Sequence, residues 1–182
     1  MDCLNCGKRA EHSLKKRYHY RESGLDNLYL KNIAIVHKCV CGQQFTEIPQ
    51  MERLHDAIAY DLLNKKTLWS GREFRFLRKW VGLTVEELGS ALGRVSRDTV
   101  SRWERDAVRI TRATHHQMLL LVLRLKEDAI NERMHLEIDV QEFLGKIAGT
   151  EHTPVSVTIT ADTLERLPFA ASTKGTRRGV CV

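Results

Sequence analysis

The chain has 182 residues, of which 42 % are hydrophobic and 29 % are charged, a composition typical of a globular protein and unlike that of a disordered one. Its longest uninterrupted apolar run, residues 118–123, is too short to span a membrane, and the N-terminus lacks an apolar signal-peptide core. We therefore expect a cytoplasmic protein with no membrane partner. Its net charge is +6, and the basic excess lies in the first two thirds of the chain.

Two closely spaced cysteine pairs, each followed by a glycine, stand near the ends of the first fifty residues: Cys3, Cys6, Cys39 and Cys41. In a reducing compartment such pairs predict a structural Zn²⁺ site with four thiolate ligands, which would stabilise a domain too small to fold on its own core. The second pair is C-x-C, not the commoner C-x-x-C. His37 is therefore an alternative fourth ligand.

Strand-forming residues occupy the segment between the cysteine pairs. Tyr18 and Tyr20 alternate with polar residues, residues 23–27 read as a turn, and residues 28–37 are rich in β-formers. These patterns predict a hairpin whose base the zinc would tie together. The basic run at residues 15–17 is more typical of a solvated face than of a binding site.

A connecting helix is expected next, over residues 51–69. Met51, Leu54, Ile58 and Leu62 recur at helical spacing. Packing against neighbouring elements explains this apolar face better than binding to a partner.

Two short helices with a tight turn between them are predicted at the centre of the chain. Thr84 and Glu87 form a capping box that starts the first helix, and Gly93 ends it. Ser96 caps the second helix, in which Val100 and Trp103 share one face. This arrangement indicates a helix-turn-helix unit within a domain that we expect at residues 70–130.

The remaining faces of the second helix carry the expected DNA contacts: Arg97, Asp98, Ser101, Arg102 and Arg105. An arginine in the major groove can make a bidentate contact to guanine, and a serine can reach a phosphate or a base edge. Residues 70–112 hold ten Lys or Arg against six Asp or Glu, an excess that suits attraction to phosphates.

The motif from residue 83 to residue 104 resembles the Cro/C1-type helix-turn-helix family. Two positions depart from that pattern. Val85 stands where the family usually has a phosphate-clamping Gln, and Asp106 stands where it usually has Gly. The resemblance thus implies a recognition helix, while phosphate clamping by the first helix is not implied.

A further helix is expected to begin at Thr111 or Thr114, with an apolar face that includes Met118, Leu121, Val122 and Leu125. Part of this face would close the domain core. The rest would pair with a second copy, because a repressor needs two recognition helices about one DNA turn apart. We expect a homodimer, and we assign His115 and His116 to packing or to the surface.

The last part of the chain, residues 131–182, is expected to form an extension. A second capping box predicts a short helix over residues 139–148, and alternation over residues 155–160 predicts a strand. A lone strand is unstable, so it would pair with a partner copy, the zinc hairpin or another protein. Residues 172–182 are expected to be disordered, with Cys181 as a free thiol.

The combination of a cysteine-rich module at residues 1–50, a connector and a Cro/C1-type domain resembles the MqsA/YgiT-type antitoxins. The resemblance implies an α+β protein in which a small zinc-bound β domain precedes an all-α helix-turn-helix domain. It implies an autorepressor that binds a palindromic operator as a homodimer and neutralises a toxin, commonly an mRNA interferase. By the same resemblance, Arg102 stands at a base-reading position, and Asp98 replaces a base-reading asparagine.

A stand-alone regulator without a toxin, for example of a mobile element, remains the alternative function. An enzyme is not expected. Four thiolates leave no open coordination position for a catalytic water, and neither a carboxylate pair nor a Ser/His/Asp arrangement stands out.

Overall fold

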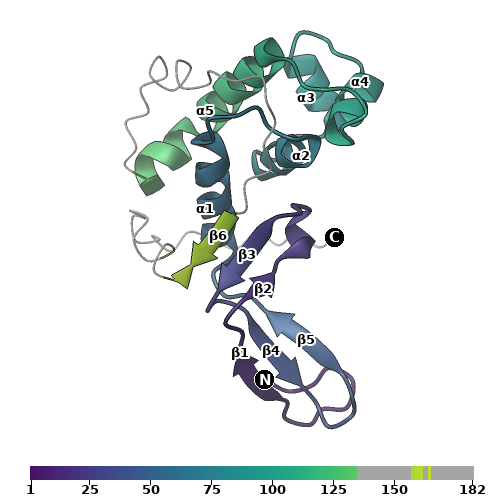
Figure 1. The fold of residues 1–182 in the computed structure, drawn as a ribbon, viewed down its shortest axis with the longest axis vertical. Helices are drawn as coiled ribbons and strands as arrows, with labels where there is room; N and C mark the ends of the chain where they lie inside the picture. Colours follow the sequence, from purple (N-terminus) through teal and green to yellow (C-terminus); the bar gives the residue numbers. More distant parts are fainter. Residues whose placement is uncertain (135–156, 162–163, 165–182) are drawn as a thin grey trace.

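The computed structural model describes residues 1–134, 157–161 and 164, with side chains up to Lys126 in the last helix. The expected helix at residues 139–148, the C-terminal tail and Cys181 lie outside the described residues. The described residues form two small sheets, five α-helices and one 3-10 helix in an α+β arrangement (Figure 1). None of the described helices is long and apolar enough to cross a membrane.

The strands of the first sheet lie next to the cysteine pairs in the chain. Its order is β1 (Glu11–Leu14), β4 (Ile35–Lys38) and β5 (Gln44–Glu47), with both pairings antiparallel. It forms one end of the molecule, together with the N-terminus (Figure 1). The sequence patterns had not predicted β1 or β5, since both are short and largely polar.

The second sheet has the order β2 (Tyr18–His19), β3 (Leu28–Lys31) and β6 (Val157–Thr160). β2 and β3 form the expected hairpin, and their connection holds the 3-10 helix η1 (Arg21–Ser23). The single strand expected over residues 28–37 is wrong. The structure has two strands there, β3 and β4, and they belong to different sheets. The chain bends between them at Asn32, which has a φ of 57°. The cysteines accordingly adjoin the first sheet and not the base of this hairpin.

The predicted C-terminal strand is confirmed, and the structure selects its partner from the three alternatives. β6 runs parallel to β3 within the same chain, with Leu30 opposite Ile159. Both of these side chains are buried, as is Leu164 beyond the strand. Part of the C-terminal extension therefore completes the N-terminal fold.

The helices follow the predicted pattern closely. α1 (Met51–Leu63) is the expected connecting helix, and α2 (Gly71–Trp80), α3 (Val85–Ala91), α4 (Arg97–Glu104) and α5 (Arg112–Met134) follow it. α2 begins with a capping box formed by Ser70 and Glu73, an S-x-x-E pattern that is also visible in the sequence.

One continuous core joins the second sheet to the helices. It runs from Tyr20, Leu28 and Leu30 through Leu54 of α1 to Phe74 of α2. The first sheet has a separate, much smaller cluster of buried residues. This division does not test the predicted domain boundaries near residues 50 and 70, which stay predictions.

Candidate metal centre and nucleic-acid interface

Two tight turns of similar construction present the four cysteines. In the first, the Gly7 N–H donates to the Cys3 carbonyl at 2.8 Å, and in the second the Gly42 N–H donates to the Cys39 carbonyl at 2.9 Å. Gly7 and Gly42 have φ values of 68° and 87°, which side chains rarely tolerate. The glycine after each pair is therefore needed to fold the turn back on itself.

The two turns bring all four sulfur atoms within 4.8 Å of one another. The Sγ atoms of Cys3 and Cys41 are 3.7 Å apart, and those of Cys6 and Cys39 are 3.3 Å apart. A tetrahedral zinc site with Zn–S bonds of about 2.3 Å needs sulfur separations of roughly 3.8 Å. Since the donors are four thiols at this spacing, Cys3, Cys6, Cys39 and Cys41 fit a zinc ion.

His37 is not part of this cluster. Its Nε2 lies 2.8 Å from Oε2 of Glu47, and its ring stacks on Phe45 at 4.7 Å between centroids. The side chain is buried within the first sheet. It therefore packs against neighbouring side chains, and the second pair supplies two thiols despite its C-x-C spacing.

The pKa values of two of these thiols are shifted in opposite directions. The backbone N–H of Gln43, followed by the neighbouring thiols, lowers the pKa of Cys41 to about 6. For Cys6, the backbone N–H of Lys8 acts in the lowering direction, but the thiols of Cys39 and Cys41 raise the pKa to about 12. Binding of a metal ion to the cluster would therefore release protons and depend on pH.

The first sheet has little else to hold it together. Its buried apolar cluster contains Cys3, Ala10 and Cys39, with Phe45 packed at its edge. A metal ion at the thiols would supply the folding free energy that such a small cluster lacks.

The expected helix-turn-helix geometry is present in α3 and α4. Thr84 accepts a hydrogen bond from the Glu87 backbone N–H at 3.2 Å, and Glu87 accepts one from the Thr84 backbone N–H at 2.7 Å, which confirms the capping box. A Cβ atom at Gly89 would lie 2.3 Å from the Val95 carbonyl oxygen. Glycine at this position thus allows the turn to pack directly on α3.

Helix α4, the expected recognition helix, begins after Ser96, whose side chain accepts from the Thr99 backbone N–H at 3.2 Å. Val100 and Trp103 are buried, as their spacing predicted. Glu104 is buried as well, and it makes ion pairs with Arg78 of α2. No sequence pattern predicts this pair, because two charged residues that are 26 positions apart give no local signal.

Arg78 and Glu104 form a bidentate pair, with Nε–Oε1 at 2.5 Å and Nη2–Oε2 at 3.2 Å. Arg78 Nη1 also donates to the Leu83 carbonyl at 2.7 Å. A buried pair is costly to break, since the partner left behind is an unpaired charge. This contact therefore fixes α4 against α2.

The residues predicted to contact DNA lie away from this packed face. Arg97, Asp98, Arg102 and Arg105 are exposed, and Ser101 is partly exposed. Arg97 Nε lies 3.1 Å from Oε1 of Glu86 at the start of α3. The contacts that these five residues would make with bases and phosphates stay predictions.

The end of α4 is closed onto the start of α2 by Asp106. This residue has the left-handed φ of 57° that the resemblance expects of a glycine, and its Oδ1 accepts from the Gly71 N–H at 2.6 Å. A Cβ atom at Gly71 would lie 2.1 Å from the Trp103 carbonyl oxygen. The aspartate thus replaces the conformational freedom of a glycine with a side-chain cap.

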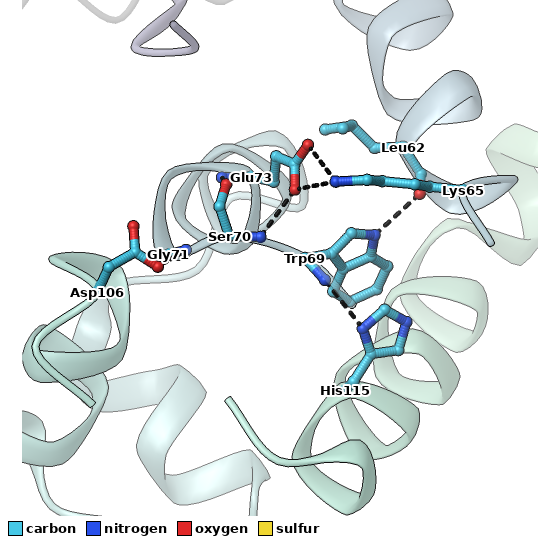
Figure 2. Close-up of polar contacts among 8 residues, drawn as sticks. All are labelled: Leu62, Lys65, Trp69, Ser70, Gly71, Glu73, Asp106 and His115. Carbon is cyan, nitrogen blue, oxygen red and sulfur yellow. Dashed lines mark hydrogen bonds and ion pairs between the residues drawn. The ribbon is translucent and has the colours of Figure 1, made fainter. Parts of the chain in front are cut away.

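A polar network fastens the connecting helix to the helix-turn-helix region (Figure 2). Lys65 donates to both carboxylate oxygens of Glu73 at 2.8 Å, and the Trp69 indole donates to the Leu62 carbonyl at 2.8 Å. His115 of α5 stacks on the Trp69 ring at 3.8 Å between centroids. The packing role expected for His115 is confirmed, and burial lowers its pKa to about 4.

Comparison with protein families gives one match. A helix-turn-helix family model matches residues 74–128, from α2 into α5. No curated protein and no solved structure matches the chain. The matched residues coincide with the helices whose turn and capping geometry is described above. The chain thus carries a helix-turn-helix domain, which supports a DNA-binding regulator of transcription.

Proposed function

We propose that this protein is a sequence-specific transcription repressor that binds its operator through α4 as a homodimer. The observation that carries the proposal is the recognition helix itself. One face of α4 is locked by the buried Arg78–Glu104 pair, and the other presents exposed arginines in a domain matched by the helix-turn-helix family. A rigid helix with guanidinium groups on its free face suits reading of the major groove.

The homodimer is supported by α5. Met118, Leu119 and Val122 are buried in the core, whereas Leu120 and Leu125 are 46 % and 48 % exposed. Exposed leucines on a helix that already closes the core are suited to contact a second copy. Equilibrium ultracentrifugation measures this directly, and a monomer at the concentrations that saturate DNA would contradict it.

We further propose that the repressor acts as an antitoxin that autoregulates its operon and neutralises a toxin, such as an mRNA interferase. The support is the pairing of a four-cysteine turn cluster with a helix-turn-helix domain in one chain. The cluster has a structural role, and we propose no catalytic activity for it. A stand-alone regulator without a toxin accounts for the same features.

The decisive experiment titrates the purified protein against the DNA directly upstream of its own gene, with scrambled DNA as the control. Specific binding at dimer stoichiometry, weakened steeply by salt, is the expected result. Equal binding to both DNAs would contradict the repressor proposal. Expression of each neighbouring small gene, alone and with this protein, then separates the antitoxin from the stand-alone regulator.

A further inference from the structure

The outward-facing side of the second sheet carries an ordered group of cationic and aromatic side chains. In β3, Leu28 and Leu30 are buried in the core, so the residues between and after them face outward. Their directly paired neighbours in β2 and β6 share that face. We call this the outer sheet face, and its residues are His19, Tyr29, Lys31 and Thr158, together with the adjacent Arg17 and Arg21.

The cations on this face are held in place by stacking and by hydrogen bonds. The guanidinium carbon of Arg17 lies 3.8 Å from the centroid of the Tyr29 ring, and His19 stacks on the same ring at 4.9 Å. His19 Nε2 donates to the Asp26 carbonyl at 2.7 Å, so its Nδ1 is free to accept from Arg21 Nε at 3.1 Å. Both guanidinium groups are thus oriented before any ligand arrives.

The chemistry of the outer sheet face suits a polyanion better than a protein. No carboxylate lies on β2, β3 or β6, and none of the exposed large apolar side chains among the described residues lies on them. A protein interface usually has an apolar centre, which this face lacks. The Tyr29 ring already contacts Arg17 and His19, so contacts with phosphates are favoured over stacking of a base.

An open hollow lies between the η1 turn and the C-terminal end of the recognition helix. Its volume is about 620 Å³, and its lining comes from η1, from α2 and from the end of α4, including Lys79 and Arg105. The acidic side chains that line it already have partners in the chain. Asp26 pairs with Arg72, Glu104 with Arg78, and Asp106 with the Gly71 N–H. Glu22, beside Arg21 in η1, accepts from the Tyr18 hydroxyl.

We propose that the outer sheet face contacts the phosphate backbone of DNA flanking the site that α4 reads, chiefly through Arg17 and Arg21. The inference rests on the proposed function for the DNA itself. It assigns to Arg17 a binding role that its basic run did not predict. The contact would add affinity without adding sequence preference, because phosphates carry no base information.

The test measures how affinity depends on salt for two duplexes. Both contain the footprint, which is the stretch of DNA upstream of the gene that the bound protein covers. One duplex ends at the footprint, and the other extends well beyond it on both sides. The Arg17→Gln/Arg21→Gln double variant is compared with wild type and with a charge-matched Lys38→Gln/Lys66→Gln control, at two exposed lysines outside the proposed interfaces. A long scrambled duplex and a single-stranded RNA of the same length complete the set.

On the long duplex, the double variant is expected to reduce the slope of log K against log [salt] by about 1 to 2, since each lost phosphate contact removes about 0.9. On the short duplex it should match wild type, and the control should match wild type on both. An Arg17→Lys variant should keep part of the salt slope that Arg17→Gln loses. Lysine keeps the charge but cannot stack as a planar group on Tyr29. An unchanged thermal unfolding midpoint verifies that the double variant is folded.

An identical slope for wild type and the double variant on the long duplexes would overturn the proposal. Loss of RNA binding with unchanged DNA slopes would overturn it too, by assigning the face to RNA. Failure of the proposed function gives a different result, in which wild type does not prefer the upstream duplex over the scrambled one. The scrambled long duplex still tests the face in that case, because phosphate contacts do not need the operator.

Discussion

The helical region from α2 to α5 and the strand-rich N-terminal region differ in the range over which their folds are specified. In the helical region, capping boxes, helix-ending glycines and apolar spacing all act within a few residues. In the N-terminal region, β1 pairs with β4 and β3 pairs with β6, a strand more than a hundred residues away. Local signals can therefore describe the first region, whereas in the second they predict the β2–β3 hairpin but not the pairings between distant strands.

The same contrast appears in how each region is stabilised. The helices share one large apolar core, and the first sheet has only a small cluster beside the cysteines. We expect variants in the two regions to fail in different ways. The following experiments test that difference, from the largest expected effect to the smallest.

Loss of one thiol should have the largest effect and should be confined to the first sheet. Cys3→Ser removes a zinc ligand, and structural zinc contributes on the order of 10 kcal/mol to small metal-dependent folds. Amide exchange should show lost protection in β1, β4 and β5, with α2 to α5 still protected and still able to bind DNA. Cys181→Ser is the matched control, and retained protection in the first sheet of Cys3→Ser would refute the metal centre.

A break in the buried ion pair should weaken the helical region instead. Glu104→Ala leaves Arg78 buried without its carboxylate partner, which should cost about 3–5 kcal/mol in the free energy of unfolding. Glu86→Ala removes a carboxylate from the exposed pair with Arg97 and should cost less than about 1 kcal/mol. Urea denaturation measures both, and equal losses would show that the pair does not fix α4 to α2.

Truncation of a buried β6 side chain should destabilise both regions. Ile159→Ala opens a cavity against the second sheet, whose core is continuous with α1 and α2, and should cost about 2–5 kcal/mol. Thr158→Ala, on the exposed side of the same strand, is the control. If Ile159→Ala leaves the unfolding of the helices unchanged, β6 does not stabilise the shared core.

Acid should destabilise the helical region through His115. Burial lowers the folded-state pKa of His115 to about 4, below the ordinary histidine value of 6.5, so the unfolded chain binds the proton more readily. The stabilising contribution is complete above pH 6.5 and is lost as the pH falls toward 4, about 3 kcal/mol in all. Unfolding curves across this range should show the loss in wild type and in the exposed-site control His12→Gln. His115→Phe should show much less of it.

Removal of a reading residue should leave both regions intact and should change binding alone. Arg102→Ala is expected to cost about 1–3 kcal/mol in operator binding and to relax sequence preference at one position. Competition assays against single-base operator variants measure this. An unchanged affinity and preference would remove Arg102 from base recognition.

The sequence by itself determined the helix-turn-helix unit and the cysteine set. Thr84 and Ser96 start helices through hydrogen bonds to nearby backbone groups, and Gly93 ends one. The four cysteines predict metal binding because they occur as two closely spaced pairs. These features depend on neighbouring residues or on side-chain identity. They can therefore be predicted without knowledge of the fold.

Apart from the β2–β3 hairpin, only the tertiary structure decided which strands pair, and it alone decided which charged residues are buried. It placed β6 on β3, split residues 28–37 between two sheets, and gave Glu104 the buried Arg78 as its partner. It also brought Arg17 and His19 onto the Tyr29 ring and placed Arg21 within hydrogen-bonding distance of His19. The physical reason is that pairing and burial depend on distance in space, and sequence periodicity specifies only which way a side chain faces within its own element.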